Sequence, residues 1–121
     1  MAWSLDARIP VRLLDVPDAP PGAVVLAEDG AGLPPAPARV EPFAAPVLAA
    51  AAHPAGCLCC QPRSSVALAL DRLFQARLRG QLPWFDGVVA VTRSAAGRAA
   101  ILAALEQDSV TTARFRLAAG P

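Results

Sequence analysis

Short apolar runs in this chain alternate with two longer stretches in which apolar residues recur at helical spacing. Residues 11–14 and 23–27 have the length and the β-branched content of buried strands, and turn-forming residues flank both runs. Residues 85–92 form a longer run of this kind, which suits a strand that is covered on both faces. The pattern therefore predicts three buried strands.

The first helical pattern covers residues 65–79. Ser64 or Ser65 can cap its start, and Gly80 supplies a stop. Its apolar side chains recur at the spacing of one helix face: Val66, Leu70, Leu73 and Phe74. This segment is predicted to be an amphipathic helix.

A second helix is predicted over residues 95–107, after Ser94, and it would bury Ile101, Leu102 and Leu105. Residues 113–117 alternate in polarity but are too few to classify. The order strand, helix, strand, helix implies a parallel α/β sheet with right-handed crossovers. We therefore expect an α/β fold with a small two-layer or three-layer parallel sheet of about three to four strands and two main helices.

Proline is concentrated in the first part of the chain, where nine of the thirteen prolines lie between Pro10 and Pro46. Each proline removes a backbone donor and restricts the residue before it, so this part cannot hold a long helix. We expect residues 29–46 to be a Pro-rich loop, irregular or disordered, within a single domain that spans residues 1–121.

Composition excludes several functions. The eleven basic residues are all arginine, there are ten acidic residues, and the chain contains no lysine and no asparagine. Without lysine there is no ammonium group to hold nucleotide phosphates and no amine to form a Schiff base. The near-zero net charge argues against non-specific binding of nucleic acid, because such binding needs clustered cations to neutralise phosphates.

No secretory or membrane-spanning segment is predicted. Asp6 and Arg8 interrupt the stretch in which a signal peptide would need an unbroken apolar run. The longest uncharged stretch, residues 42–61, is cut by Pro46 and Pro54, so a transmembrane helix is not expected there. We therefore expect a cytoplasmic protein without a membrane partner, in which thiols stay reduced.

All three cysteines, Cys57, Cys59 and Cys60, lie within four consecutive positions. Converging thiolates are soft ligands that suit zinc or copper(I). The spacing differs from that of zinc fingers, and one such motif cannot close a four-ligand site alone. Four sources of a fourth ligand stay open: His53, Glu28, Asp29 or a thiol of a second chain.

Two other interpretations of the cysteines compete with metal binding. Cysteine often behaves as a small buried hydrophobe, which explains one isolated thiol more easily than three neighbouring ones. The vicinal pair Cys59 and Cys60 could also form a strained, redox-sensing disulfide. His53, the only histidine, is more simply a loop residue than a ligand.

The Gly-Cys-Leu-Cys-Cys sequence at residues 56–60 resembles the G-C-[IL]-C-C signature of CobW-type P-loop GTPases, a family of metallochaperones. Residues 9–14 resemble the first strand of that family, which a phosphate loop normally follows. Residues 23–30 resemble the family strand that ends in Asn-Glu-Phe-Gly, and the later helix and strand follow in the family order. The resemblance implies a truncated P-loop-NTPase-like fold, in which the three cysteines are metal ligands and Glu28 is a neighbour of the site.

The departures from that family concern its nucleotide site. Residues 15–22 stand where the family carries G-x-x-G-x-G-K-T and a complete helix, and they contain no lysine and no Ser or Thr for magnesium. Residues 91–94 replace Glu-Thr-Thr-Gly, and the base-reading Asn-Lys-x-Asp motif is impossible without asparagine and lysine. We therefore expect no GTP binding, no GTP hydrolysis and no other enzyme activity.

The leading hypothesis is a nucleotide-free, CobW-like protein that binds a thiophilic metal, with zinc expected, through Cys57, Cys59 and Cys60. Such a site would serve in metal buffering, transfer or sensing, because three ligands leave a coordination position open. One alternative is a non-catalytic interaction protein that docks on a full-length GTPase-like protein or on its own copies through exposed sheet edges. A decayed fragment without a selected role is the other alternative.

Overall fold

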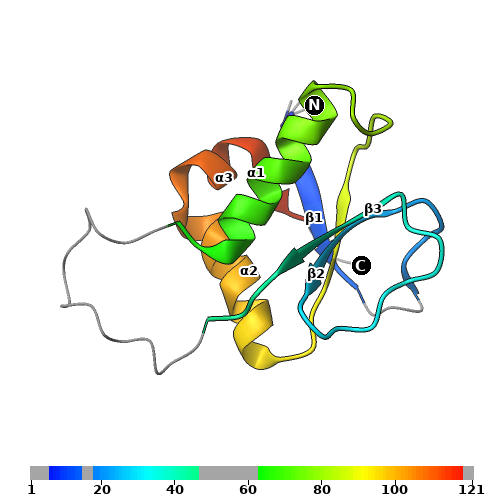
Figure 1. Ribbon diagram of the computed structural model, residues 1–121. Coiled ribbons are helices and arrows are strands. Elements are labelled where there is room, and N and C mark those ends of the chain that lie inside the picture. Colours follow the sequence, from blue (N-terminus) through cyan, green and yellow to red (C-terminus); the bar gives the residue numbers. More distant parts are fainter. Residues whose placement is uncertain (1–5, 15–17, 47–62, 119–121) are drawn as a thin grey trace, which may run out of the picture.

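The computed structural model of the chain describes residues 6–14, 18–46 and 63–118 (Figure 1). These parts of the chain contain five strands and three helices. Their order and bounds are β1 (Ile9–Leu13), β2 (Val24–Glu28), β3 (Arg39–Phe43), α1 (Ser65–Leu78), β4 (Val88–Val91), α2 (Ala95–Gln107), α3 (Ser109–Arg114) and β5 (Phe115–Leu117).

The five strands form one sheet in the order β3-β2-β4-β1-β5, and every pairing is parallel. β4 lies between two strands that precede it in the chain, with Val89 opposite Val25 of β2 and Val88 opposite Val11 of β1. The prediction of an α/β fold with a small parallel sheet is confirmed, and the sheet has more strands than the sequence pattern predicted.

β3 lies inside residues 29–46, which the sequence predicts to be an irregular or disordered loop, and that prediction is wrong for β3. The strand pairs only with β2, so it is an edge strand, where a proline such as Pro42 is tolerated. Phe43 and Val40 belong to hydrophobic clusters on opposite faces of the sheet and attach β3 to both. The short tail that was too brief to classify holds the other edge strand, β5.

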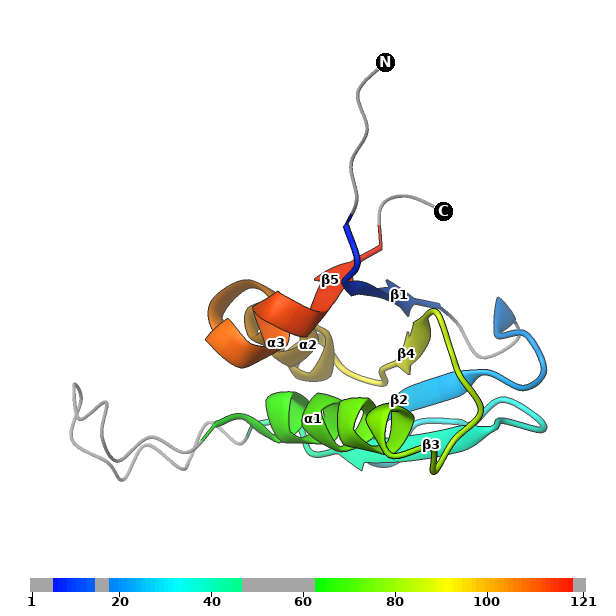
Figure 2. The ribbon, with the colours of Figure 1, turned by 90° about the horizontal axis from the view of Figure 1, so that it is seen from above.

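The helices cover one face of the sheet (Figure 2). Val24 and Leu26 of β2 pack in the larger hydrophobic cluster, which contains the buried side chains of α1 and α2. Val25 and Ala27, which alternate with them, belong to a smaller cluster on the opposite face, where loop residues rather than helices pack against the strands. The structure is therefore the two-layer form of the expected sheet.

Serine caps begin both long helices, as the sequence predicts. The hydroxyl oxygens of Ser64 and Ser94 accept hydrogen bonds from first-turn amides at 3.1 and 2.9 Å. α2 covers the predicted residues, and α1 ends before Gly80, whose φ of +69° is left-handed. The strand predicted over 85–92 is shorter, because the chain bends at Asp86 before β4 begins. Among the residues that the structure describes, no helix has both the length and the apolar character to cross a bilayer.

Candidate functional site at the carboxyl edge of the sheet

The candidate chemistry of the sequence falls partly outside the described residues. Cys57, Cys59, Cys60 and His53 all lie in residues 47–62, which the structure does not describe. Glu28, the remaining candidate, ends β2 at the carboxyl edge of the sheet. Within residues 6–14, 18–46 and 63–118, no group of three or more His, Cys, Asp or Glu side chains is placed to hold a metal ion. The described site is therefore built around Glu28.

The carboxylate of Glu28 is buried between the end of β2 and the start of α2. Its Oε1 atom accepts hydrogen bonds from the backbone amides of Arg93 at 2.8 Å and Ser94 at 3.1 Å. Its Oε2 atom accepts a hydrogen bond from the hydroxyl of Ser94 at 2.6 Å. These bonds, led by the one from the Ser94 hydroxyl, hold the pKa of Glu28 below its ordinary value. The carboxylate thus fixes the start of α2 on the sheet, and its role as a neighbour of a metal stays a prediction.

Gly97, in the first turn of α2, makes room for this carboxylate. A Cβ atom at position 97 would overlap Oε1 of Glu28, so no larger residue fits without moving one of the two elements. Sequence analysis missed this residue. The available signal was a glycine three positions after a capping serine, in a helix otherwise rich in alanine.

The amino terminus of α2 is therefore occupied by a group of the protein itself. Free amides at a helix start commonly bind phosphate or other anions. Here the amides of Arg93 and Ser94 point at Glu28, and the amide of Gly97 donates to the hydroxyl of Ser94 at 2.9 Å. These three amides are consequently not free to bind a ligand anion.

Arg93 also closes the turn that follows β2. Its Nε atom donates to the carbonyl oxygen of Asp29 at 2.7 Å, and the amide of Asp29 donates to the carbonyl oxygen of Phe43 at 2.8 Å. Gly30 adopts a φ of +85°, and a Cβ atom there would lie 2.8 Å from the Nε atom of Arg93. The ends of β2 and β3 and the start of α2 are thus joined into one unit.

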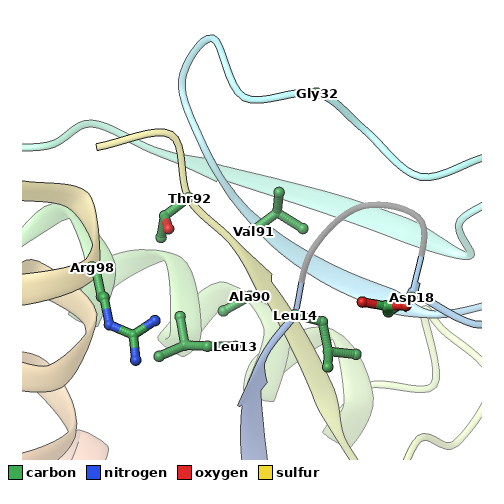
Figure 3. A pocket seen from close by; sticks show the side chains of 8 residues that line it. All are labelled: Leu13, Leu14, Asp18, Gly32, Ala90, Val91, Thr92 and Arg98. Carbon is green, nitrogen blue, oxygen red and sulfur yellow. The ribbon is translucent and has the colours of Figure 1, made fainter. Parts of the chain in front are cut away.

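A crevice of about 390 Å³ opens beside this unit, between the carboxyl ends of β1 and β4 (Figure 3). Strand ends, two loops and α2 line it with Leu13, Leu14, Asp18, Gly32, Ala90, Val91, Thr92 and Arg98. Leu14 and Ala19, which follow β1 in the chain, pack on the non-helical face, whereas β4 leads into α2 on the helical face. Open α/β sheets commonly bind ligands where two such connections diverge. Figure 3 shows the charged side chains on opposite sides, with Arg98 next to Leu13 and Asp18 next to Leu14.

The described residues on either side of the cysteine segment are both bound to α1. On one side, the amide of Ala44 donates to the hydroxyl of Ser65 at 2.9 Å, which joins the end of β3 to the start of α1. On the other side, Arg63 forms ion pairs with Asp71 of α1 and, at 2.9 Å, with Asp108. Ala44 and Arg63 are therefore both attached to α1.

Arg63 connects α1, α2 and α3. Its partner Asp71 lies in α1, and its partner Asp108 follows α2 directly and is the N-cap of α3. The amide of Thr111 donates to Oδ1 of Asp108 at 3.0 Å, while the guanidinium of Arg63 binds both carboxylate oxygens. The bonds from Arg63, followed by the one from Thr111, lower the pKa of Asp108 to about 2. The pKa of Arg63 is raised in turn by its bonds to Asp108 and Asp71. Sequence analysis did not identify this cluster, whose members lie far apart in the chain.

The carboxyl edge thus combines a carboxylate that caps α2 with a crevice that contains one arginine and one aspartate. The described carboxylates of Glu28 and Asp108 act in helix capping. Comparison with known proteins gives no further assignment, because no family model, no curated protein and no solved structure matches this chain.

Proposed function

We propose that this chain binds a thiophilic metal ion, zinc in the first place, through the thiolates of Cys57, Cys59 and Cys60, and that it does so without a nucleotide. The observation that carries the proposal is the clustering of all three cysteines of the chain within four positions. Three thiolates are strong soft ligands, and they leave one coordination position open for exchange. Metal buffering, transfer or sensing is the class of function that such a site serves.

The anchors beside the cysteine segment support this proposal. The bond between Ala44 and Ser65 and the ion pairs of Arg63 hold the two flanks of the segment next to one helix end. A segment whose flanks are fixed loses less chain entropy when its side chains converge on one ion than a segment with free ends. This smaller loss of chain entropy favours metal binding by the segment.

Independence from nucleotide is supported by two features. The chain contains no lysine for a phosphate loop and neither asparagine nor lysine for recognition of guanine. In addition, Glu28 accepts the amides at the start of α2, which removes one natural phosphate site from the carboxyl edge. The proposed protein would thus keep the metal ligands of a CobW-like protein without its nucleotide site.

The test is a competitive zinc titration of the reduced full chain against a chromophoric chelator, with metal analysis of the purified protein. We expect one zinc per chain in the wild type and none in the variant with Cys57→Ser, Cys59→Ser and Cys60→Ser. Gln61→Ala, in the same segment, is the matched control and should bind zinc as the wild type does. Equal zinc content in the wild type and the triple variant would refute metal binding by the thiols. Binding of GTP in a parallel titration at micromolar concentration would refute nucleotide independence.

The alternative of an interaction protein has one supporting observation, which is that the sheet has two edge strands in the described residues, β3 and β5. Edge strands expose unpaired backbone groups that invite pairing with another chain. Pro42 works against such pairing at β3, so β5 is the better candidate. Sedimentation of the purified chain over a range of concentrations tests self-association, and strictly monomeric behaviour would count against pairing between copies.

A further inference from the structure

The amino-terminal edge of the sheet carries a groove that the proposed function does not use. The groove has a volume of about 630 Å³ and lies between the start of β1, the end of α1 and the end of α3. We call it the Trp84 groove, and six of its side chains enter the argument: Arg8, Phe74, Arg77, Leu78, Trp84 and Arg114.

Two large apolar side chains are unusually exposed in the Trp84 groove. Trp84 is 67% exposed and Leu78 is 62% exposed, which makes them the most exposed large hydrophobic residues in the described parts of the chain. Such exposure is unfavourable in an isolated protein, and neighbouring exposed apolar residues commonly mark interaction sites.

The Trp84 ring is held in place although it is exposed. The guanidinium of Arg77 stacks 3.6 Å from the ring centroid on one side, and the indole N–H of Trp84 donates to Asp86 at 3.1 Å. An exposed ring in a fixed orientation loses little entropy on binding, and tryptophan and arginine are the residues that most often dominate binding energy. The groove is thus preorganised to receive an apolar side chain.

The charge of the groove indicates the kind of partner. Arg8, Arg77 and Arg114 line it, and Asp6 is its acidic residue. Arg8 pairs with Asp6 at 2.8 Å and Arg114 pairs with Asp71 at 3.6 Å, whereas Arg77 makes no ion pair with any carboxylate of the described residues. Arg77 is therefore the arginine of the groove without a carboxylate partner in the described residues, and it lies against the apolar centre.

We infer that the Trp84 groove binds an acidic peptide segment of a partner protein, with an apolar side chain against Trp84 and Leu78 and a carboxylate facing Arg77. A second copy of this chain offers fewer free carboxylates than an acidic segment does, because Asp6, Glu28, Glu41, Asp71 and Asp108, five of its ten acidic residues, are held in internal bonds. A nucleic acid fits less well too, since a net charge of +1 does not supply an extended phosphate-binding surface.

The probe for this inference is a glutamate-rich peptide with one central leucine, and its counterpart carries lysine in place of glutamate. Fluorescence of Trp84 reports binding in a Trp3→Phe background, in which Trp84 is the only tryptophan. We expect the acidic peptide to shift the emission and to bind about tenfold more weakly after Arg77→Gln, which corresponds to a loss of about 1.4 kcal/mol. Arg98→Gln, at the opposite edge of the sheet, is the matched control and should leave the affinity unchanged.

Three results would overturn the inference. The first is equal binding of the acidic and the lysine peptides, or no binding of the acidic one at millimolar concentration. The second is tighter binding of a thymidine oligonucleotide, measured by the same fluorescence, which would assign the groove to nucleic acid. The third is self-association of the free protein that Trp84→Ala abolishes, which would assign the groove to a second copy. Because Trp84 is exposed, this variant should melt as the parent does, and a melting curve checks that it is folded.

Discussion

Ser94 binds the carboxylate of Glu28 with both its hydroxyl and its backbone amide, at 2.6 and 3.1 Å, across 66 positions of sequence. The same hydroxyl accepts the amide of Gly97, so one serine caps α2 and ties it to β2. This arrangement settles the orientation of α2 on the sheet, and its parts can be tested separately.

Gly97→Ala should destabilise the protein by about 1–3 kcal/mol, because the added Cβ would overlap the buried carboxylate of Glu28. Without that contact, alanine would be the better helix residue. Urea unfolding followed by circular dichroism measures the change. Gly87→Ala is the control, since its added Cβ would meet its nearest atom at 3.7 Å, and it should stay within about 0.5 kcal/mol of the wild type. Equal stability of the two variants would contradict this account of Gly97.

Glu28→Gln should cost about 1–3 kcal/mol, because an amide cannot accept all the hydrogen bonds that both carboxylate oxygens accept. Ser94→Ala should cost about 1 kcal/mol through loss of the cap. The double variant should be more stable than the sum of the two losses predicts, with a coupling of about 0.5–3 kcal/mol. Additive losses in the cycle would show that the two residues act independently.

The free energy of unfolding should decrease at acidic pH, because two carboxylates have a lower pKa in the folded protein than their ordinary value. A group whose pKa is lower in the folded than in the unfolded state adds stability above its unfolded pKa and loses it as the pH falls through its folded pKa. Asp108 has an ordinary pKa of 3.8 and a folded value of about 2, and the pKa of Glu28 is also lowered, from 4.5. The free energy of unfolding should therefore decrease from about pH 4.5 towards about pH 2. Chemical unfolding across this range should show a flatter profile for Glu28→Gln, and an unchanged slope would argue against a lowered pKa of Glu28.

Asp108 combines a cap and an ion pair, and two substitutions separate them. Asp108→Asn should keep the cap of α3 and lose the charge opposite Arg63, whereas Asp108→Ala should lose both. We expect the alanine variant to be less stable than the asparagine variant by about 1 kcal/mol. Glu106→Gln, nearby and exposed, is the control and should be neutral in the same thermal melts. Equal losses from both Asp108 variants would mean that the cap contributes nothing.

Local signals in the sequence predicted the elements that local chemistry determines. Ser64 and Ser94 marked both helix starts, since a capping hydroxyl acts within one turn. The sequence did not predict β3, because a proline such as Pro42 normally interrupts a strand. The strand is possible because β3 lies at the edge of the sheet. That place depends on pairing with β2, which no local pattern encodes.

The site was less predictable than the fold, because its contacts join distant positions. Arg63 and Asp108 are 45 positions apart, and neither belongs to a motif. Glu28 was singled out as a possible fourth metal ligand and, through the family resemblance, as a neighbour of the metal site, while the structure places it in a cap for α2. The function of Gly97 depends on the depth at which Glu28 is buried, which is a property of packing rather than of spacing.

The non-helical face of the sheet has a consequence for how the chain folds. Loop residues, rather than a helix, pack there against Val25 and Val89, and the segment that supplies part of them contains Pro34, which is buried. Proline has few conformations to lose, so a proline-rich loop can be ordered with a smaller loss of chain entropy than an ordinary loop of equal length. The prolines that rule out a helix in this segment thus favour an ordered loop, which packs on the face of the sheet opposite the helices.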